Sequence, residues 1–259
     1  MIALAVTDFP LAIDLVARGR LQVDYLETGG HYVDRTAALL PEQPLLLHNA
    51  VYEWSLGDPR AIERPDVVPL TLRRLHRTGA PWLSAHLGFS AAEVAFDEWM
   101  RASSPALPRD DLLANICRNA RALSEAIPVP LILENLDYCP GGAYEHICEA
   151  EFIAAVIEET GAGLLLDLAH AQVSAARLGV PIGGYLARLP LDRVRQIHVS
   201  GPREIDGMLT DVHETLREQD YALLREVLRR ARPAAVTLEY SRDAAALIEQ
   251  AGWLREILA

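Results

Sequence analysis

Short, nearly continuous hydrophobic segments recur along the chain, and their spacing leaves room for a helix after most of them. Eight segments are rich in leucine, valine, isoleucine and alanine, at residues 2–8, 21–28, 44–50, 81–88, 129–135, 162–170, 194–201 and 234–241. A strand with one solvent-exposed face would alternate apolar and polar residues. Near-continuous apolar runs are instead typical of parallel strands covered on both faces.

Several of the intervening stretches have the periodicity of amphipathic helices. Helices are predicted at residues 66–79, 110–127, 151–161, 220–233 and 248–259. Gly79 and Gly161 stand where two of these patterns stop, so both are predicted to form C-terminal caps.

Eight strands alternating with helices in 259 residues predict one α/β fold in particular, a single (β/α)8 TIM barrel. No linker or low-complexity stretch divides the chain, so residues 1–259 are expected to form one domain. The final amphipathic stretch would then complete the barrel wall, which we favour over a role in binding a partner. A doubly wound open sheet is the alternative, but no G-x-G-x-x-G motif follows the first segment.

Composition narrows the class of protein. With 51% hydrophobic and 23% charged residues, the chain can bury a large core, which excludes a disordered protein. The net charge of -12 would repel nucleic acid, which we do not expect as a partner. Three cysteines without a C-x-x-C motif argue against a disulfide framework and a thiolate zinc site, and favour a reducing cytoplasm. We expect no membrane span or targeting segment.

Candidate chemistry lies at the strand ends. Each hydrophobic segment carries an acid or a histidine at or near its C-terminal end, namely Asp8, Glu27, His48, His86, Glu134, Asp167, His198 and Glu239. In a parallel barrel these ends meet at one face, where the active sites of this fold are built. A single polar residue of this kind could simply mark where a buried strand ends at the protein surface, but the presence of one in every segment predicts a functional site.

The residue types predict a metal centre, because imidazole and carboxylate groups without a thiolate suit iron, manganese or zinc. His170 follows Asp167 by three residues, and Asp211 and His213 lie two apart, where side chains of an extended segment point the same way. The predicted ligands are His48, His86, Glu134, Asp167, His170, His198, Asp211, His213 and Glu239. This number exceeds the needs of one ion, so two or three ions with bridging carboxylates are expected.

Other polar residues are assigned different roles. Nearby glycines and Pro10 indicate turn chemistry for Asp8 and Glu27, so neither is included among the ligands. Asn49 and Asn135 either orient ligands or cap turns. Three histidines remain outside this set. His76 is expected at the surface. His31 and His146 are also expected at the surface, with contact to substrate as the alternative.

Nucleophilic catalysis is less well supported. No G-x-S-x-G motif is present, and Cys117 falls within a helical pattern, where a buried structural thiol is expected. Cys139 and Cys148 flank a glycine turn, and Cys139 follows Glu134 closely enough to meet a substrate.

These motifs resemble those of the multinuclear non-haem iron-dependent oxidative enzymes, a barrel family related to the xylose-isomerase-like barrels. The resemblance runs from the third segment to the last, through LLLHN, SAHLGF, LILENLDY, GLLLDLAHAQVSA, YLARLPLDRVRQIHVSG, GMLTDVHE and TLEYS. Two positions depart from the family pattern. Ala85 replaces a glutamate before His86, and His170 replaces the second asparagine of D-V-N-N.

The resemblance implies a centre of two or three iron ions that activates dioxygen and oxidises cysteine residues of a ribosomally made peptide, which a partner protein commonly presents. It also implies eight ligands, those predicted above other than His170. Among the ligands we expect Glu134, Asp211 and His213 to act in catalysis as well.

Two other readings stay open. A manganese or zinc enzyme that isomerises a sugar or hydrolyses a phosphoester would use the same barrel and ligand types, and would act on a small molecule without oxygen. A non-enzymatic metal-binding module is the third, although structural sites are usually closed by four ligands. Substrate selection is expected in loops 52–66, 89–109 and 202–217.

Overall fold

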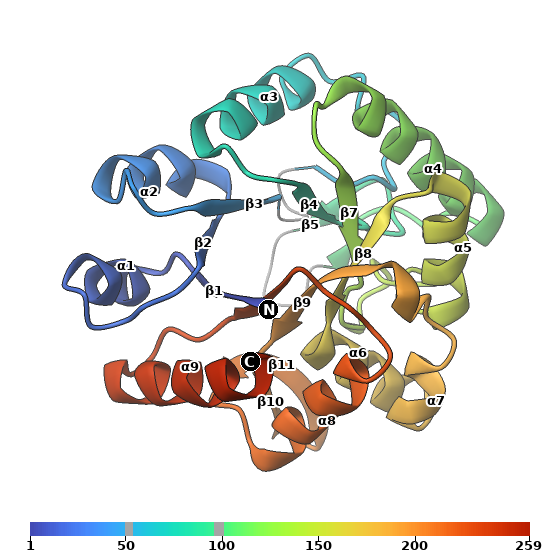
Figure 1. Cartoon of the computed structure of the whole chain (residues 1–259). Coiled ribbons are helices and arrows are strands. Elements are labelled where there is room, and N and C mark those ends of the chain that lie inside the picture. The colour runs from blue at the N-terminus through green and yellow to red at the C-terminus, as the bar shows by residue number, and fades with distance from the viewer. Residues whose placement is uncertain (50–53, 96–100) are drawn as a thin grey trace.

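The computed structural model describes residues 1–49, 54–95 and 101–259. Eight parallel strands close into a barrel in the order β1-β12-β9-β8-β7-β4-β3-β2, which confirms the predicted (β/α)8 fold (Figure 1). The barrel strands are β1 (Ala3–Thr7), β2 (Tyr25–Thr28), β3 (Leu45–Asn49), β4 (Leu83–His86), β7 (Leu131–Glu134), β8 (Gly163–Asp167), β9 (Val194–Val199) and β12 (Ala235–Leu238). All eight lie within the predicted segments.

The helices form a ring outside the barrel (Figure 1). They are α1 (Pro10–Ala17), α2 (Val33–Leu39), α3 (Val67–Thr78), α4 (Arg109–Ala126), α5 (Ala150–Thr160), α6 (Leu168–Arg177), α7 (Ile182–Leu186), α8 (Glu218–Leu228) and α9 (Ala244–Leu258), with short 3-10 helices η1 (Gly30–Tyr32) and η2 (Leu191–Arg193). Gly79 and Gly161 end α3 and α5 with positive φ angles of 62° and 71°, as predicted. No helix in the described residues is long and apolar enough to span a membrane.

Alternation along the strands explains why the candidate residues share one chamber. Successive strand residues point to opposite faces, so every second residue enters the barrel. The first inward positions are largely apolar, with Ala5, Leu46, Ile132, Leu165, Ala235 and the neighbouring Trp82 packed into a small cluster. The residues two positions after Leu46, Ile132 and Leu165 are His48, Glu134 and Asp167. The apolar layer therefore closes the chamber below the polar one.

The outward positions face the helices. Leu47, Leu133, Leu166 and Val199 belong to the main core between sheet and helices, and all are buried. Both strand faces are thus covered, which accounts for the near-continuous apolar runs.

Two antiparallel hairpins on the barrel were not predicted. They are β5 (Val94–Ala95) with β6 (Arg101–Ala102), and β10 (Gly201–Ile205) with β11 (Met208–Glu214). Both fall in segments predicted as loops, because short, partly exposed hairpins lack the hydrophobic runs of a barrel strand. Of the loop residues predicted to select substrate, 52–53 and 96–100 lie outside the described part of the chain.

Candidate metal centre

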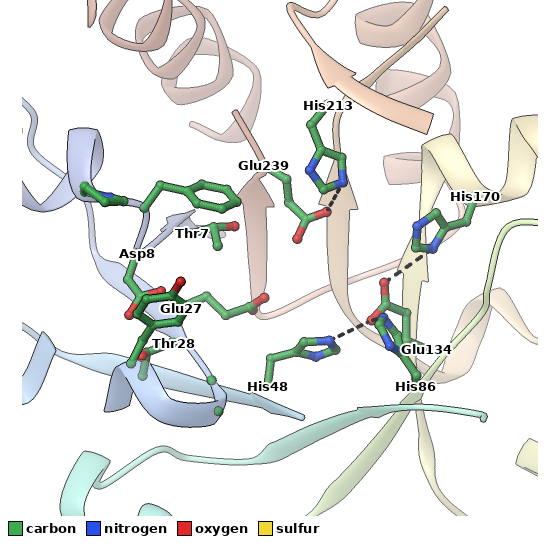
Figure 2. Close-up of a pocket in the computed structure, with 15 residues that line it drawn as sticks. Thr7, Asp8, Glu27, Thr28, His48, His86, Glu134, His170, His213 and Glu239 are labelled. Carbon is green, nitrogen blue, oxygen red and sulfur yellow. Dashed lines mark ion pairs between the residues drawn. The ribbon is translucent and has the colours of Figure 1, made fainter. Parts of the chain in front are cut away.

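The predicted ligands gather at the C-terminal ends of the barrel strands. Figure 2 shows histidines and carboxylates from several strands facing one another across a pocket. Among the described residues, three sets bring one ligand atom each within 4.8 Å of one another: His48, His86 and Glu134; Glu134, Asp167 and His198; and Glu27, His198 and Glu239. Glu134 and His198 each belong to two sets, so the groups form one continuous centre.

The first set joins β3, β4 and β7. Glu134 Oε2 lies 3.3 Å from His48 Nε2 and 3.0 Å from His86 Nε2. His48 Nδ1 lies 2.9 Å from Ser84 Oγ, which fixes the ring and turns Nε2 to the carboxylate. Burial lowers the pKa of His48 to about 4, so this ring is neutral at pH 7 and able to bind a metal. Burial opposes the charge on Glu134, but the three nearby histidines His86, His198 and His48 hold its pKa well below the usual range.

The second set centres on His198, whose two ring nitrogens have different surroundings. Nδ1 lies 3.4 Å from Glu134 Oε1, 3.5 Å from Glu239 Oε1 and 4.0 Å from Asp167 Oδ2. Nε2 lies 2.8 Å from Glu27 Oε1 on the opposite edge of the ring. The ring therefore presents Nδ1 to the other predicted ligands and is held through Nε2.

Glu27 is a site residue that the sequence analysis assigned to a turn, and that assignment is wrong. It lies on β2, is 2% exposed and points into the barrel. Its Oε2 accepts hydrogen bonds from Gln196 Nε2 and from Thr237 Oγ1, and Trp82 Nε1 donates to Gln196 Oε1 at 2.7 Å. Because both oxygens of Glu27 are engaged, we assign it to positioning His198, as carboxylates behind ligand histidines commonly do.

A third group comes from α6 and the β10–β11 hairpin. Asp211 Oδ2 lies 2.9 Å from His213 Nε2 and 3.5 Å from His170 Nε2, while Ser200 Oγ donates to Asp211 Oδ1 at 2.7 Å. His213 Nε2 also lies 3.5 Å from Glu239 Oε2, which joins this group to the second. The D-x-H spacing therefore brings both side chains to one place, as expected.

Local backbone geometry orients the side chains of Asp167, His170 and His213. Asp167 is the N-cap of α6, and its Oδ1 accepts from the His170 backbone N–H at 2.7 Å. His170 Nδ1 donates to the Asn135 carbonyl at 2.9 Å, which leaves Nε2 for Asp211. His213 has a φ of 48°, a left-handed conformation that a non-glycine residue adopts rarely and mostly at functional positions.

Burial and neighbouring charges have opposing effects on the pKa values of His213 and Asp167. Burial disfavours a charged His213, but the hydrogen bond to Asp211 outweighs it and raises its pKa to about 9. Burial raises the pKa of Asp167 to about 7, against the lowering effect of His170. A cation in the chamber would relieve both conditions, because it replaces protons on imidazole and stabilises carboxylates.

Unsatisfied polar atoms test whether a metal fits. Glu134 Oε2, Asp167 Oδ2 and His198 Nδ1 are buried and form no hydrogen bond with any described residue. Buried polar atoms are rarely left so, unless an ion or water completes them. All three are metal-ligating atoms that point into the same chamber, so the donor set fits a bound cation.

The other predicted positions have clear outcomes. Asn135 orients Asp167, since its Oδ1 accepts from the Asp167 N–H at 2.8 Å and its Nδ2 donates to the Asp167 carbonyl at 3.0 Å. His31 and His76 are exposed, and the half-buried His146 lies 3.1 Å from Glu149 Oε1 through its Nδ1. The thiol of Cys117 is buried in α4, as expected.

The pocket above the centre has a second half, built by β1, β2 and η1. The whole pocket has a volume of about 290 Å³. Asp8 and Thr28 lie on the side opposite the metal-ligating histidines (Figure 2), and Phe9 and Tyr32 also line the pocket. Asp8 lies in the connection between β1 and α1, consistent with the expected turn, and it is 6% exposed and accepts a hydrogen bond from Thr36 Oγ1. Burial raises the pKa of the Asp8 carboxyl, against hydrogen bonds from Thr28 and Thr36.

Comparisons with known proteins identify a family and relatives of this chain. The model of one family, described as RiPP precursor modification enzyme MbnB/TglH/ChrH, matches residues 22–257. A UPF0276 protein of Paraburkholderia phytofirmans is 30% identical over 225 residues, which cover 84% of this chain and 71% of that protein. A UPF0276 protein of Caulobacter vibrioides is 29% identical over 229 residues, covering 85% and 77%.

Solved structures share the fold at low sequence identity. D-psicose 3-epimerase from Clostridium cellulolyticum H10 has a TM-score of 0.64 and 14% identity, with 99% of each chain covered. The IOLI protein, described with a binding zinc atom, has a TM-score of 0.67 and 15% identity, with 99% of this chain and 98% of that one covered. At this identity the likeness supports the barrel and carries no reaction over.

Proposed function

This chain belongs to the MbnB/TglH/ChrH family of RiPP precursor modification enzymes, and from that premise we propose that it is a multinuclear iron enzyme that uses dioxygen to oxidise cysteine residues of a ribosomally made peptide. The observation that carries the proposal is the surplus of buried ligands. Glu134, Asp167 and His198 present unsatisfied atoms to one chamber, and further histidines and carboxylates surround them. A single ion would leave much of this set unused.

The predicted ligands would divide among two or three ions. His48, His86 and Glu134 would hold one ion, Asp167, His198 and Glu239 a second, and His170, Asp211 and His213 a third. When bound, iron supplies one-electron redox chemistry with dioxygen and Lewis acidity toward a substrate thiolate.

The protein's own groups provide positioning and proton control. Glu27 holds His198 through Nε2, and Asn135 holds Asp167 through its backbone. The wall formed by Asp8, Thr28 and Tyr32 faces the centre across the pocket and would receive the substrate. Of the residues proposed to act in catalysis, Glu134 contacts His48 and His198, and Asp211 Oδ2 holds the proton of His213 Nε2 until a metal displaces it.

The proposal is tested by reconstituting metal-free protein with iron(II) without oxygen, then adding a cysteine-containing precursor peptide and oxygen. We expect oxygen uptake together with a mass change confined to the cysteine-containing segment. Glu134→Ala and His198→Ala should abolish the reaction with the fold intact, whereas the exposed Glu42→Ala should behave as wild type.

Other outcomes would contradict the proposal. Turnover of a sugar or phosphoester with manganese or zinc, unaffected by removal of oxygen, would favour the isomerase or hydrolase reading. Unfolding of the Glu134→Ala and His198→Ala variants would indicate a structural metal site. A peptide-presenting partner protein and a cytoplasmic location stay predictions, and repeating the assay with neighbouring gene products tests the first of them.

A further inference from the structure

A basic groove lies outside the barrel, between α2 and α3, which pack side by side (Figure 1). Its volume is about 500 Å³, and its charged or titratable lining consists of His31, Asp34, Arg73, Arg74, His76 and Arg77. Gly30 lines both this groove and the metal pocket. Gly30 therefore lies between the groove and the metal pocket.

The positive charge of this groove is local. The chain has 24 basic residues, all of them arginine, against 36 acidic ones, so its overall field repels anions. In the groove three arginines face one carboxylate, Asp34, which is 94% exposed and lies 3.7 Å from Arg77 Nε. An exposed pair at this distance neutralises little of the charge. Arg73 and Arg77 also stand one turn apart on α3, an arrangement of like charges that weakens a helix.

Arg74 links the groove to the centre. It is half-buried, and its Nη1 lies 3.5 Å from Asn49 Oδ1. Asn49 directly follows the predicted ligand His48 at the end of β3. A molecule lying along the arginines is thereby placed beside the strand end that carries a metal-ligating residue.

The spacing of the arginines favours an extended acidic peptide. Arg73 and Arg77 are separated by about 6 Å along the axis of α3, from the rise of about 1.5 Å per helical residue. Alternate side chains of an extended strand are about 6.8 Å apart. Guanidinium groups bind carboxylates through paired hydrogen bonds, so two acidic side chains at alternate positions match this pair.

We propose that the groove binds an acidic segment of the precursor peptide while another part of the same peptide occupies the metal pocket. This inference rests on the proposed function, since it names how that substrate is held. The acidic segment would lie on α3. It would be separated from the oxidised cysteine by the stretch of peptide needed to run from the groove, past Gly30, to the metal pocket.

The test is fluorescence anisotropy of a rhodamine-labelled peptide of alternating glutamate and alanine, with holoenzyme kept free of oxygen. Arg73→Glu/Arg77→Glu should weaken binding by at least about tenfold, because like charges then face each other. The matched control is Arg229→Glu/Arg230→Glu, which makes the same charge change on exposed residues at the end of α8, across the barrel from α3 (Figure 1). The control should bind within about twofold of wild type, and Arg73→Gln/Arg77→Gln should reproduce the loss if the glutamate variant fails to fold.

Equal weakening by the groove and control variants would overturn the proposal, since it would reflect net charge alone. Competition by inorganic phosphate as strong as by unlabelled peptide would also overturn it, in favour of a single-anion site. Binding is measured without turnover, so the two proposals fail separately. Arginine-dependent binding without any peptide oxidation would contradict the proposed function, whereas oxidation unaffected by Arg73→Glu/Arg77→Glu would contradict the groove.

Discussion

At the scale of single residues, the centre depends on side chains that hold other side chains. His198 is buried, and its Nδ1 faces the predicted ligands only because Glu27 and the groups behind it hold Nε2. The clustering of the predicted ligands could be foreseen, since an ionisable residue that ends an apolar run stands out in the sequence. Glu27 also ends such a run, but the glycines after it indicated a turn, and no sequence pattern reports that its oxygens meet Gln196 from a distant strand.

The role of Glu27 gives a first prediction. Glu27→Gln removes the charge that stabilises the Nε2–H of His198 but keeps the shape of the side chain. Metal affinity or turnover should fall by about 10- to 100-fold, as for other carboxylates behind metal-binding histidines. Titration with iron(II) monitored by absorbance, together with turnover, measures the change. The exposed Glu42→Gln is the matched control, and equal affinities of the two variants would contradict the role.

The shifted pKa values predict how metal binding depends on pH. Without metal, the hydrogen bond to Asp211 raises the pKa of His213 to about 9, so its imidazole is protonated at pH 7. A metal must displace that proton, so binding should tighten as the pH rises from 7 to 9, by up to about tenfold per pH unit for each proton released. His48, with a pKa lowered to about 4, adds no dependence in this range.

Isothermal titration calorimetry in two buffers of different ionisation enthalpy would count the protons released. Asp211→Asn removes the carboxylate that holds the proton on His213, so metal binding should release fewer protons and depend less steeply on pH, even though overall affinity falls. Affinity that is constant from pH 7 to pH 9 in the wild type would contradict the assignment.

At the scale of elements, strands and helices bring residues together that are far apart in the sequence. The β10–β11 hairpin brings Asp211 and His213 over the barrel, and α6, which packs against this hairpin, brings His170 to the same place. The D-x-H spacing predicted that the hairpin pair would act together, but not the left-handed conformation of His213. That conformation depends on pairing with β10, which the sequence does not reveal because both strands are partly exposed and lack a continuous apolar run.

A close approach between β2 and β3 gives a prediction at this scale. A Cβ atom at Gly29 would lie 2.2 Å from the backbone oxygen of His48, so a side chain there must displace the end of β3. Gly29→Ala should lower the free energy of unfolding by about 1–3 kcal/mol and weaken metal binding, since overpacking moves a predicted ligand. Thermal unfolding and metal titration measure both effects.

Gly252 supplies the opposite control. It lies within α9, and a Cβ atom there would have no heavy atom within 4 Å. Gly252→Ala should raise the free energy of unfolding by about 0.5–1 kcal/mol, because alanine loses less backbone entropy in a helix, and it should leave metal binding unchanged. Similar changes in the free energy of unfolding in the two variants would contradict this prediction, because they would show that the backbone near Gly29 accommodates a methyl group without loss of stability.

At the scale of the whole molecule, the sequence predicts the barrel well and its surface poorly. The fold follows from apolar runs on both faces of each strand, and eight such runs with helices between them leave few other architectures. The chamber follows from the same pattern, because parallel strands align their ends. The groove between α2 and α3 was not predictable, since its arginines face α2 only after the helices pack.

We propose that one chamber holds two or three iron ions for oxidative chemistry. Metal analysis with Mössbauer spectroscopy, on protein made in iron-supplemented cells and purified without oxygen, tests this directly. We expect two or three iron ions per chain with magnetic coupling between them, lost together in Glu134→Ala. Zinc or manganese alone, or one isolated iron ion with full peptide oxidation, would contradict it.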